Sequence, residues 1–204
     1  MSTHVEFWFE FASTYSYLTI MRIDDLATDY GVEVEWKPFL LGPIFAAQGW
    51  NTSPFNIYPS KGRYMWRDME RQSVKYDLPF KRPDPDKKNA FPQNGLAAAR
   101  MAMIGLKKPW GRAFCKSVFT AQFAEGRDTG DRAFVESLAR QAGAEEQDIQ
   151  LAYEDANKTA LRSQTEQAVA LGLFGAPSFI VDKELFWGDD RLDDAFAFAA
   201  SLKV

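Results

Sequence analysis

Hydrophobic positions change their period along this chain, from strand-like to helix-like and back. Val5 to Phe11 is a strongly apolar and aromatic run, which predicts a strand buried on both faces. Residues 17–30 carry apolar side chains at helical spacing and end at Gly31, a common helix end. Residues 32–38 alternate apolar and charged positions, which predicts a half-exposed strand. Residues 1–40 therefore predict a βαβ unit with parallel strands.

The middle of the chain carries no strand pattern. Residues 42–60 contain three prolines and several other turn formers, which predict a long irregular loop of the kind that often serves function. Residues 81–86 predict a second loop, which leads to Phe91-Pro92. The predicted helices between these loops and Gly172 span residues 61–76, 95–106, 111–123, 131–142, 148–157 and 160–171.

Strand patterns return near the end of the chain. Residues 178–181 and 185–187 predict a hairpin around Asp182-Lys183-Glu184, and a last helix is predicted over residues 190–202. The expectation is an α/β fold in which residues 1–41 and 173–204 form one discontinuous domain. Residues 42–172 form an all-helical insertion, and its final helix leads back to that domain.

Composition narrows the class of protein. The chain has 204 residues, 46% of them hydrophobic, so a sizeable core is expected. The net charge of −4 gives no reason to expect nucleic acid or an anionic membrane as a partner. No apolar run approaches the ~20 residues of a membrane span, and the start of the chain shows no signal-peptide pattern. We expect a cytoplasmic protein.

The chain has one cysteine, Cys115, and one histidine, His4. An internal disulfide and a CxxC redox pair are therefore excluded. A His/Cys metal site is not expected, and neither is a Ser-His-Asp triad around Ser13. Cys115 lies in a helical pattern among apolar residues and is expected in the core rather than as a reactive thiol. A bound cofactor is then the natural source of chemistry.

Two segments at opposite ends of the chain carry the candidate chemistry. Ser13 stands where the first strand becomes a helix, and a helix start with a hydroxyl donor suits a thiolate or carboxylate. An ordinary N-cap is an equal alternative for Ser13. Pro177 breaks the strand ladder, which exposes the backbone of Ala176 to an extended, peptide-like ligand. Whether the Ala176-Pro177 bond is cis or trans stays open at this point.

Further candidates lie at the last helix and in the proline-rich loop. Asp189 and Asp190 open the predicted last helix, where they either cap it or accept hydrogen bonds from a ligand ammonium group. Asn51 and Lys61 lie in or beside the loop, where solvated surface is the simpler interpretation. An aromatic set is expected to serve partly as core and partly as the wall of a pocket for a flat substrate. Its members are Trp50, Phe55, Tyr58, Tyr64 and Trp66.

These motifs together resemble a known family. The order of strand, serine turn, helix, X-Pro strand and hairpin is similar to that of thioredoxin-type folds, with Ser13 where redox members hold a cysteine pair. Nearly the whole chain resembles the 2-hydroxychromene-2-carboxylate isomerases, related to kappa-class glutathione transferases within the DsbA-like thioredoxin folds. The matching segments are Phe9–Leu18, Pro59–Met65, Phe174–Pro177 and Phe186–Arg191. Each is weak alone, but their order and separation are specific.

The resemblance implies glutathione as cofactor. It places Ser13 on the glutathione sulfur, Ala176 on the cysteinyl backbone beside a cis Pro177, and Asp189 and Asp190 on the γ-glutamyl end. Asn51 lies near the other end of the tripeptide, and Lys61, in a matching segment, joins the implied binding residues. The chain departs from the family at Thr14, where a proline is usual, and at Glu10, where an aspartate is usual.

The implied activity is an isomerisation that uses the thiolate of glutathione and no nucleophile of the protein. In the family, a ring-opened hydroxychromene carboxylate becomes trans-o-hydroxybenzylidenepyruvate by reversible thiolate addition and bond rotation. A small aromatic substrate and, by analogy, a homodimer are expected. The alternatives are a kappa-like glutathione transferase and a non-catalytic glutathione-binding module. A dithiol oxidoreductase is excluded because position 13 is not a cysteine.

Overall fold

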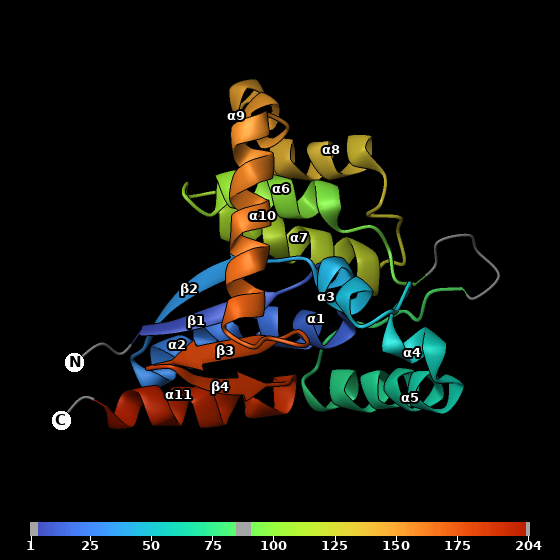
Figure 1. Ribbon diagram of the computed structural model, residues 1–204, viewed down its shortest axis with the longest axis vertical. Coiled ribbons are helices and arrows are strands. Elements are labelled where there is room, and N and C mark those ends of the chain that lie inside the picture. The colour runs from blue at the N-terminus through green and yellow to red at the C-terminus, as the bar shows by residue number, and fades with distance from the viewer. Residues whose placement is uncertain (1–3, 85–90, 203–204) are drawn as a thin grey trace.

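The chain folds around one mixed four-stranded sheet in the computed structural model, which describes residues 4–84 and 91–202 (Figure 1). The strands are β1 (His4–Phe9), β2 (Glu33–Pro38), β3 (Ser178–Val181) and β4 (Glu184–Trp187), in the order β2-β1-β3-β4. β1 and β2 are parallel, whereas β3 is antiparallel to both β1 and β4. The α/β fold built from both ends of the chain is therefore confirmed.

Helices make up most of the rest of the described chain. They are α1 (Thr14–Ile20), α2 (Ile23–Tyr30), α3 (Leu41–Ala47), α4 (Pro54–Ile57), α5 (Pro59–Lys75), α6 (Leu96–Gly105), α7 (Gly111–Phe123), α8 (Arg132–Ala142), α9 (Glu146–Ala152), α10 (Asp155–Ala170), the 3₁₀ turn η1 (Asp189–Arg191) and α11 (Leu192–Ser201).

The central strand is buried on both faces, as its sequence predicts. Phe7 and Phe9 stack on one face, where Phe7 also stacks on Phe179 of β3 and meets the edge of Trp36 of β2. Trp8 points to the other face and packs edge-on against Phe39. The first face belongs to the main core and the second to a smaller core closed by residues of α3 and α10. Side-chain alternation along β1 thus divides one sheet between two cores.

Three predicted helices are corrected by the structure. The single helix predicted over residues 17–30 is two helices, α1 and α2, and Arg22 at the break is held by Leu18 and Asp189. The predicted helix 148–157 likewise ends at Ala152, and α10 begins at Asp155. The last helix begins at Leu192, after η1, rather than at residue 190. Long-range contacts set such breaks, and periodicity within one segment does not reveal them.

The predicted irregular loop over residues 42–60 is the largest correction. The segment contains α3, α4 and the start of α5. Pro54 and Pro59 stand in the first turns of α4 and α5. Proline is favoured at that position because its fixed φ suits the helix and its missing N–H is not needed there. Two prolines that were counted as signs of an irregular loop therefore start helices.

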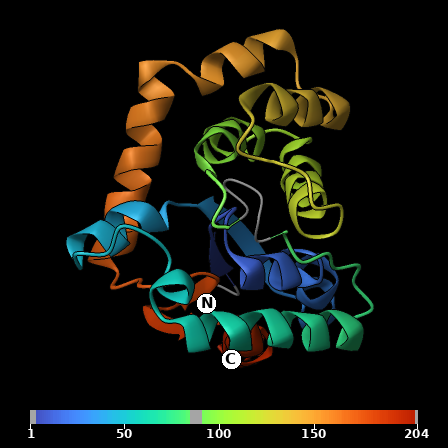
Figure 2. The same ribbon diagram turned by 90° about the vertical axis from the view of Figure 1, so that its right-hand side faces the viewer.

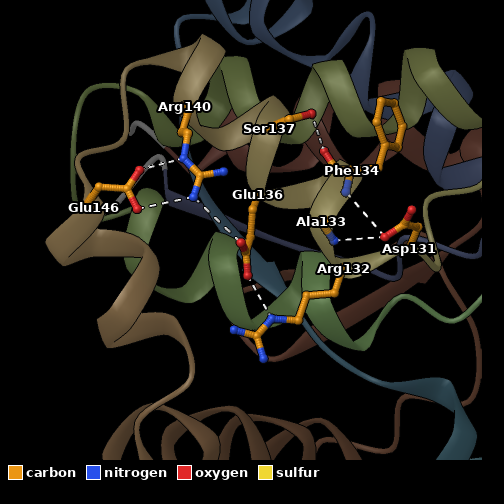
Figure 3. Close-up of polar contacts among 8 residues, drawn as sticks. All are labelled: Asp131, Arg132, Ala133, Phe134, Glu136, Ser137, Arg140 and Glu146. Atoms are coloured by element: carbon orange, nitrogen blue, oxygen red, sulfur yellow. Dashed lines mark hydrogen bonds and ion pairs between the residues drawn. The ribbon is translucent and has the colours of Figure 1, made fainter.

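α5 lies below the sheet in Figure 1, level with α11, whereas α6 to α9 form a layer above the sheet, and α10 leads from that layer back to β3 (Figures 1 and 2). Within this layer an exposed chain of ion pairs joins α8 to the start of α9 (Figure 3). Its members are Arg132, Glu136, Arg140 and Glu146. No described helix is long and apolar enough to cross a membrane. The division into residues 1–41 with 173–204 and residues 42–172 stays a prediction.

Candidate functional site

Ser13 and Ala176, 163 residues apart, meet beside the sheet. Ser13 has extended backbone angles and caps α1, because its Oγ accepts a hydrogen bond from the Ser16 N–H at 3.2 Å. The same hydroxyl donates its proton to the carbonyl oxygen of Ala176 at 2.9 Å. The N-cap alternative and the long-range contact are thus both real, and one side chain provides them together. α1 has only seven residues, so the hydroxyl itself is the clearest donor at this turn.

Ala176 offers backbone groups that the sheet does not use. The Ala176-Pro177 bond is cis, and β3 begins only at Ser178. Among the described residues, none accepts a hydrogen bond from the Ala176 N–H. Ser178 fixes the turn by donating its hydroxyl to the Gly175 carbonyl at 2.9 Å. The result is a free N–H next to a carbonyl that is engaged only by a serine hydroxyl, an arrangement that suits an extended peptide.

Asp189 is buried and occupied by the protein's own groups. Its Oδ1 accepts hydrogen bonds from Thr19 Oγ1 at 2.9 Å and from an Arg22 nitrogen at 2.8 Å. Burial raises the pKa of Asp189, and Arg22 and Thr19 counteract that rise. Arg22 is itself stacked 3.6 Å from the centre of the Tyr76 ring. Asp189 therefore ties η1 to α1 and is not an open acceptor for a ligand.

Asp190 is the more accessible member of the acidic pair. Its side chain is 74% exposed and lies 3.3 Å from Arg191. The predicted capping alternative for Asp190 is wrong, because Gly188 precedes η1 as N-cap and Arg191 is the N-cap of α11. A β-carbon at Gly188, whose φ is +114°, would meet the Asp190 carboxylate. Glycine at that position therefore leaves room for the carboxylate.

Asn51 and Lys61 are both exposed and stand at the two ends of the segment that holds α4. Asn51 follows α3, and Lys61 lies in the first turn of α5. The Lys61 ammonium lies 5.1 Å from the centre of the Tyr58 ring. In the same region Trp66 packs against Phe80 and Phe91, while Tyr64 is 62% exposed. The predicted aromatic set is thus divided between partly buried packing and open surface.

Two acidic side chains near Ser13 escaped the sequence analysis as contributors to the site. Glu10 is buried and accepts hydrogen bonds from the Leu41 N–H at 2.9 Å and the Ala12 N–H at 3.4 Å. Burial raises the pKa of Glu10, and these N–H groups oppose the rise. Asp68 of α5 accepts a hydrogen bond from Tyr15 at 3.0 Å. Burial raises the pKa of Tyr15 above its usual value, and Asp68 adds to that rise. These contacts fix α3 and α5 against the Ser13 turn.

An exposed aromatic pair borders Ala176, and the sequence analysis missed it as a pair. Phe174 and Trp187 are 47% and 52% exposed, and their rings meet edge to face at 4.8 Å. A β-carbon at Gly175 would collide with the Trp187 indole, so the indole covers the backbone just before Ala176. The pair offers an apolar surface for a flat ring beside the Ser13–Ala176 contact.

The remaining candidates lie outside this site. Cys115 is fully buried, and burial raises the pKa of its thiol, which confirms the expected core position. His4, Glu6 and Glu35 place ligand-type atoms within 4.8 Å of one another. The ammonium of Lys37 already lies 2.9 Å from Glu6 and 3.3 Å from Glu35. The two carboxylates of this cluster are therefore already paired with the protein's own lysine.

The fold and this site define a class of protein. Residues 4–197 match the model of the DSBA-like thioredoxin domain, and the chain belongs to that family. The chain is 29% identical over 196 residues to a 2-hydroxychromene-2-carboxylate isomerase of Sphingobium xenophagum, covering 95% of this chain and 96% of the relative. It is also 24% identical to glutathione S-transferase kappa 2 of Caenorhabditis elegans, covering 96% and 91%.

A solved structure of a 2-hydroxychromene-2-carboxylate isomerase superimposes on this chain with a TM-score of 0.83. The sequence identity is 24%, and the match covers 98% of this chain and 95% of the other. The DsbA-like fold and the family resemblance predicted from the motifs are thereby confirmed.

Proposed function

We propose that this protein is a glutathione-dependent cis–trans isomerase that acts on 2-hydroxychromene-2-carboxylate or a similar aromatic enone. The observation that carries the proposal is the Ser13 hydroxyl held 2.9 Å from the Ala176 carbonyl, beside the Ala176 N–H, which has no acceptor among the described residues. A hydroxyl donor beside a strand-type N–H and C=O of one residue is what a cysteine-containing peptide needs for its sulfur and its backbone. The name of one relative, a kappa glutathione transferase, supports the same ligand, and the name of another supports an isomerase.

Each proposed binding residue has one task. Ala176 would pair through its backbone with the middle residue of the tripeptide, and Pro177 keeps that backbone out of the ladder. Asp190 would accept hydrogen bonds from the γ-glutamyl ammonium, while Asp189 holds η1 in place through Arg22. Asn51 and Lys61 would contact the glycyl end, where a lysine suits a carboxylate.

Glutathione when bound supplies a thiolate that adds reversibly to a conjugated carbon, so that the former double bond can rotate. Ser13 would donate its hydroxyl proton to the sulfur, which favours the thiolate form. Phe174 and Trp187 would hold the aromatic ring of the substrate beside that sulfur. The protein itself provides binding, orientation and one hydrogen bond.

Two measurements test the proposal. Glutathione at millimolar concentration should raise the melting temperature, because a ligand that binds only the native state stabilises it. The protein should then convert cis substrate to trans while the total free glutathione stays constant. Consumption of one glutathione per substrate would instead support a kappa-like transferase, and binding without turnover would support a non-catalytic module. No thermal shift would contradict glutathione as the ligand.

A further inference from the structure

The proton of the Ser13 hydroxyl is committed in this structure. A serine hydroxyl has one proton to donate, and Ser13 donates it to the Ala176 carbonyl at 2.9 Å. The same oxygen accepts the hydrogen bond from the Ser16 N–H at 3.2 Å. Ser13 therefore cannot donate to a ligand sulfur until the hydroxyl turns away from Ala176.

Turning the hydroxyl away leaves the Ala176 carbonyl without its donor. Both residues are partly buried, and a ligand lying across them would also exclude water from the carbonyl. A carbonyl that loses its partner under such a ligand carries a free-energy penalty. The penalty disappears only if the ligand brings a donor of its own to Ala176.

We propose that Ser13 is a specificity switch, which releases its proton to a thiol only when the ligand's own amide N–H replaces it on the Ala176 carbonyl. This inference rests on the proposed function and deepens it. The adjacent N–H of Ala176, which no group in the described part of the chain accepts, supports it, because an N–H and a C=O on one residue together pair with one residue of an extended peptide. The ligand class is then a peptide with a thiol on the residue that pairs with Ala176. Plain thiols, and peptides without that N–H, leave Ser13 bound to Ala176.

The experiment compares glutathione with the analogue methylated on the cysteinyl amide nitrogen, each bound to the parent and to Ser13→Ala. The readout is the pKa of the bound thiol, followed by ultraviolet thiolate absorbance, together with affinity from titration calorimetry. In the parent, the pKa of the glutathione thiol should fall on binding. The thiolate form of glutathione should also bind the parent at least about tenfold more tightly than the thiolate form of the methylated peptide does. Steric effects of the methyl group act on the parent and on Ser13→Ala alike, so they cancel when the effect of methylation is compared between the two proteins.

For a sulfur-free peptide, γ-glutamyl-alanyl-glycine, loss of the Ser13 hydroxyl is not expected to weaken binding, in contrast to glutathione. Removal of the Ser13 hydroxyl frees the Ala176 carbonyl, so Ser13→Ala should bind this peptide as tightly as the parent or more tightly. The same variant should lose the lowered thiol pKa of bound glutathione. Ser13→Gly is the second hydroxyl-free variant, because glycine at an N-cap costs the helix only a few tenths of a kcal/mol relative to serine.

The outcomes separate this inference from the proposed function. If glutathione binds with a lowered thiol pKa and amide methylation changes that pKa equally in parent and Ser13→Ala, the switch is wrong and the proposed function stands. Weaker binding of the sulfur-free peptide by both Ser13 variants would also overturn the switch. If glutathione does not bind the parent at all, both fail.

Discussion

Arg22, at the break between α1 and α2, binds the buried carboxylate of Asp189 at 2.8 Å and thereby fixes the 3₁₀ turn that carries Asp190. Thr19 donates to the same carboxylate oxygen. The two neighbouring aspartates thus have different environments, one enclosed and neutralised and the other 74% exposed. Substitutions at the two positions should separate support of the turn from ligand binding.

Asp189→Asn should destabilise the fold by about 3 kcal/mol, because it leaves the half-enclosed Arg22 cation without its partner charge. Asp190→Asn should leave the unfolding free energy nearly unchanged. It should, however, weaken glutathione binding about five- to thirtyfold, since it removes a charge-assisted hydrogen bond. Urea unfolding and titration calorimetry measure the two effects. An Asp190→Asn variant that binds glutathione like the parent would place the ammonium elsewhere.

Ser13→Ala should lower the free energy of unfolding by about 1–2 kcal/mol, because the cap to Ser16 and the hydrogen bond to Ala176 are both lost. With the fold intact, turnover should fall by on the order of ten- to a thousandfold, as expected for a lost donor to a developing anion. Chemical unfolding and steady-state kinetics measure these losses. Unchanged turnover would show that Ser13 is only structural.

Glu10→Gln should alter the pH dependence of stability. Because burial raises the folded-state pKa of Glu10, the native state binds more protons than the unfolded state between the unfolded and folded pKa values. Protonation of Glu10 therefore adds stability as the pH falls through the folded pKa towards about 4.3, and this contribution is lost as the pH rises. Relative to Glu10→Gln, the parent should gain stability on acidification. A constant difference at all pH values would contradict this assignment.

Cys115→Ala should reduce stability by about 1 kcal/mol, as a small cavity in a packed core does. The glutathione-induced thermal shift should remain, because the thiol is fully buried. In the native parent, a thiol reagent should react with Cys115 only slowly. Loss of glutathione-dependent activity with an intact fold would mean that the protein uses its own thiol.

Trp187→Leu should raise the KM for an aromatic substrate about two- to tenfold, since an aromatic contact contributes roughly 0.5–1.5 kcal/mol. Glutathione affinity serves as the internal control and should change little. A KM equal to that of the parent would remove the Phe174–Trp187 pair from the substrate site.

Local chemistry in the sequence determined the strands, most helices and the family. The apolar, aromatic run at Phe7 to Phe9 favours a strand buried on both faces, and Gly31 and Gly143 end helices in the left-handed conformation. Ser13 could be named as a cap and Cys115 as a core residue because their neighbours along the chain already define those environments. The segments around Ser13, Ala176 and Asp189 carried the family resemblance because each is a short run of residues that are adjacent in the sequence.

Tertiary structure alone decided which groups remain open to a ligand. Arg22 breaks one predicted helix and binds Asp189, 167 residues away, so the two aspartates differ although their local sequences are nearly alike. The Ser13 hydroxyl meets Ala176 only after β1 and β3 pair, and Trp187 covers Gly175 only after the β3–β4 hairpin closes. Hydrogen-bond partners and burial depend on residues far apart in the chain. A pattern read along one segment therefore locates a site but does not reveal which of its groups are already engaged.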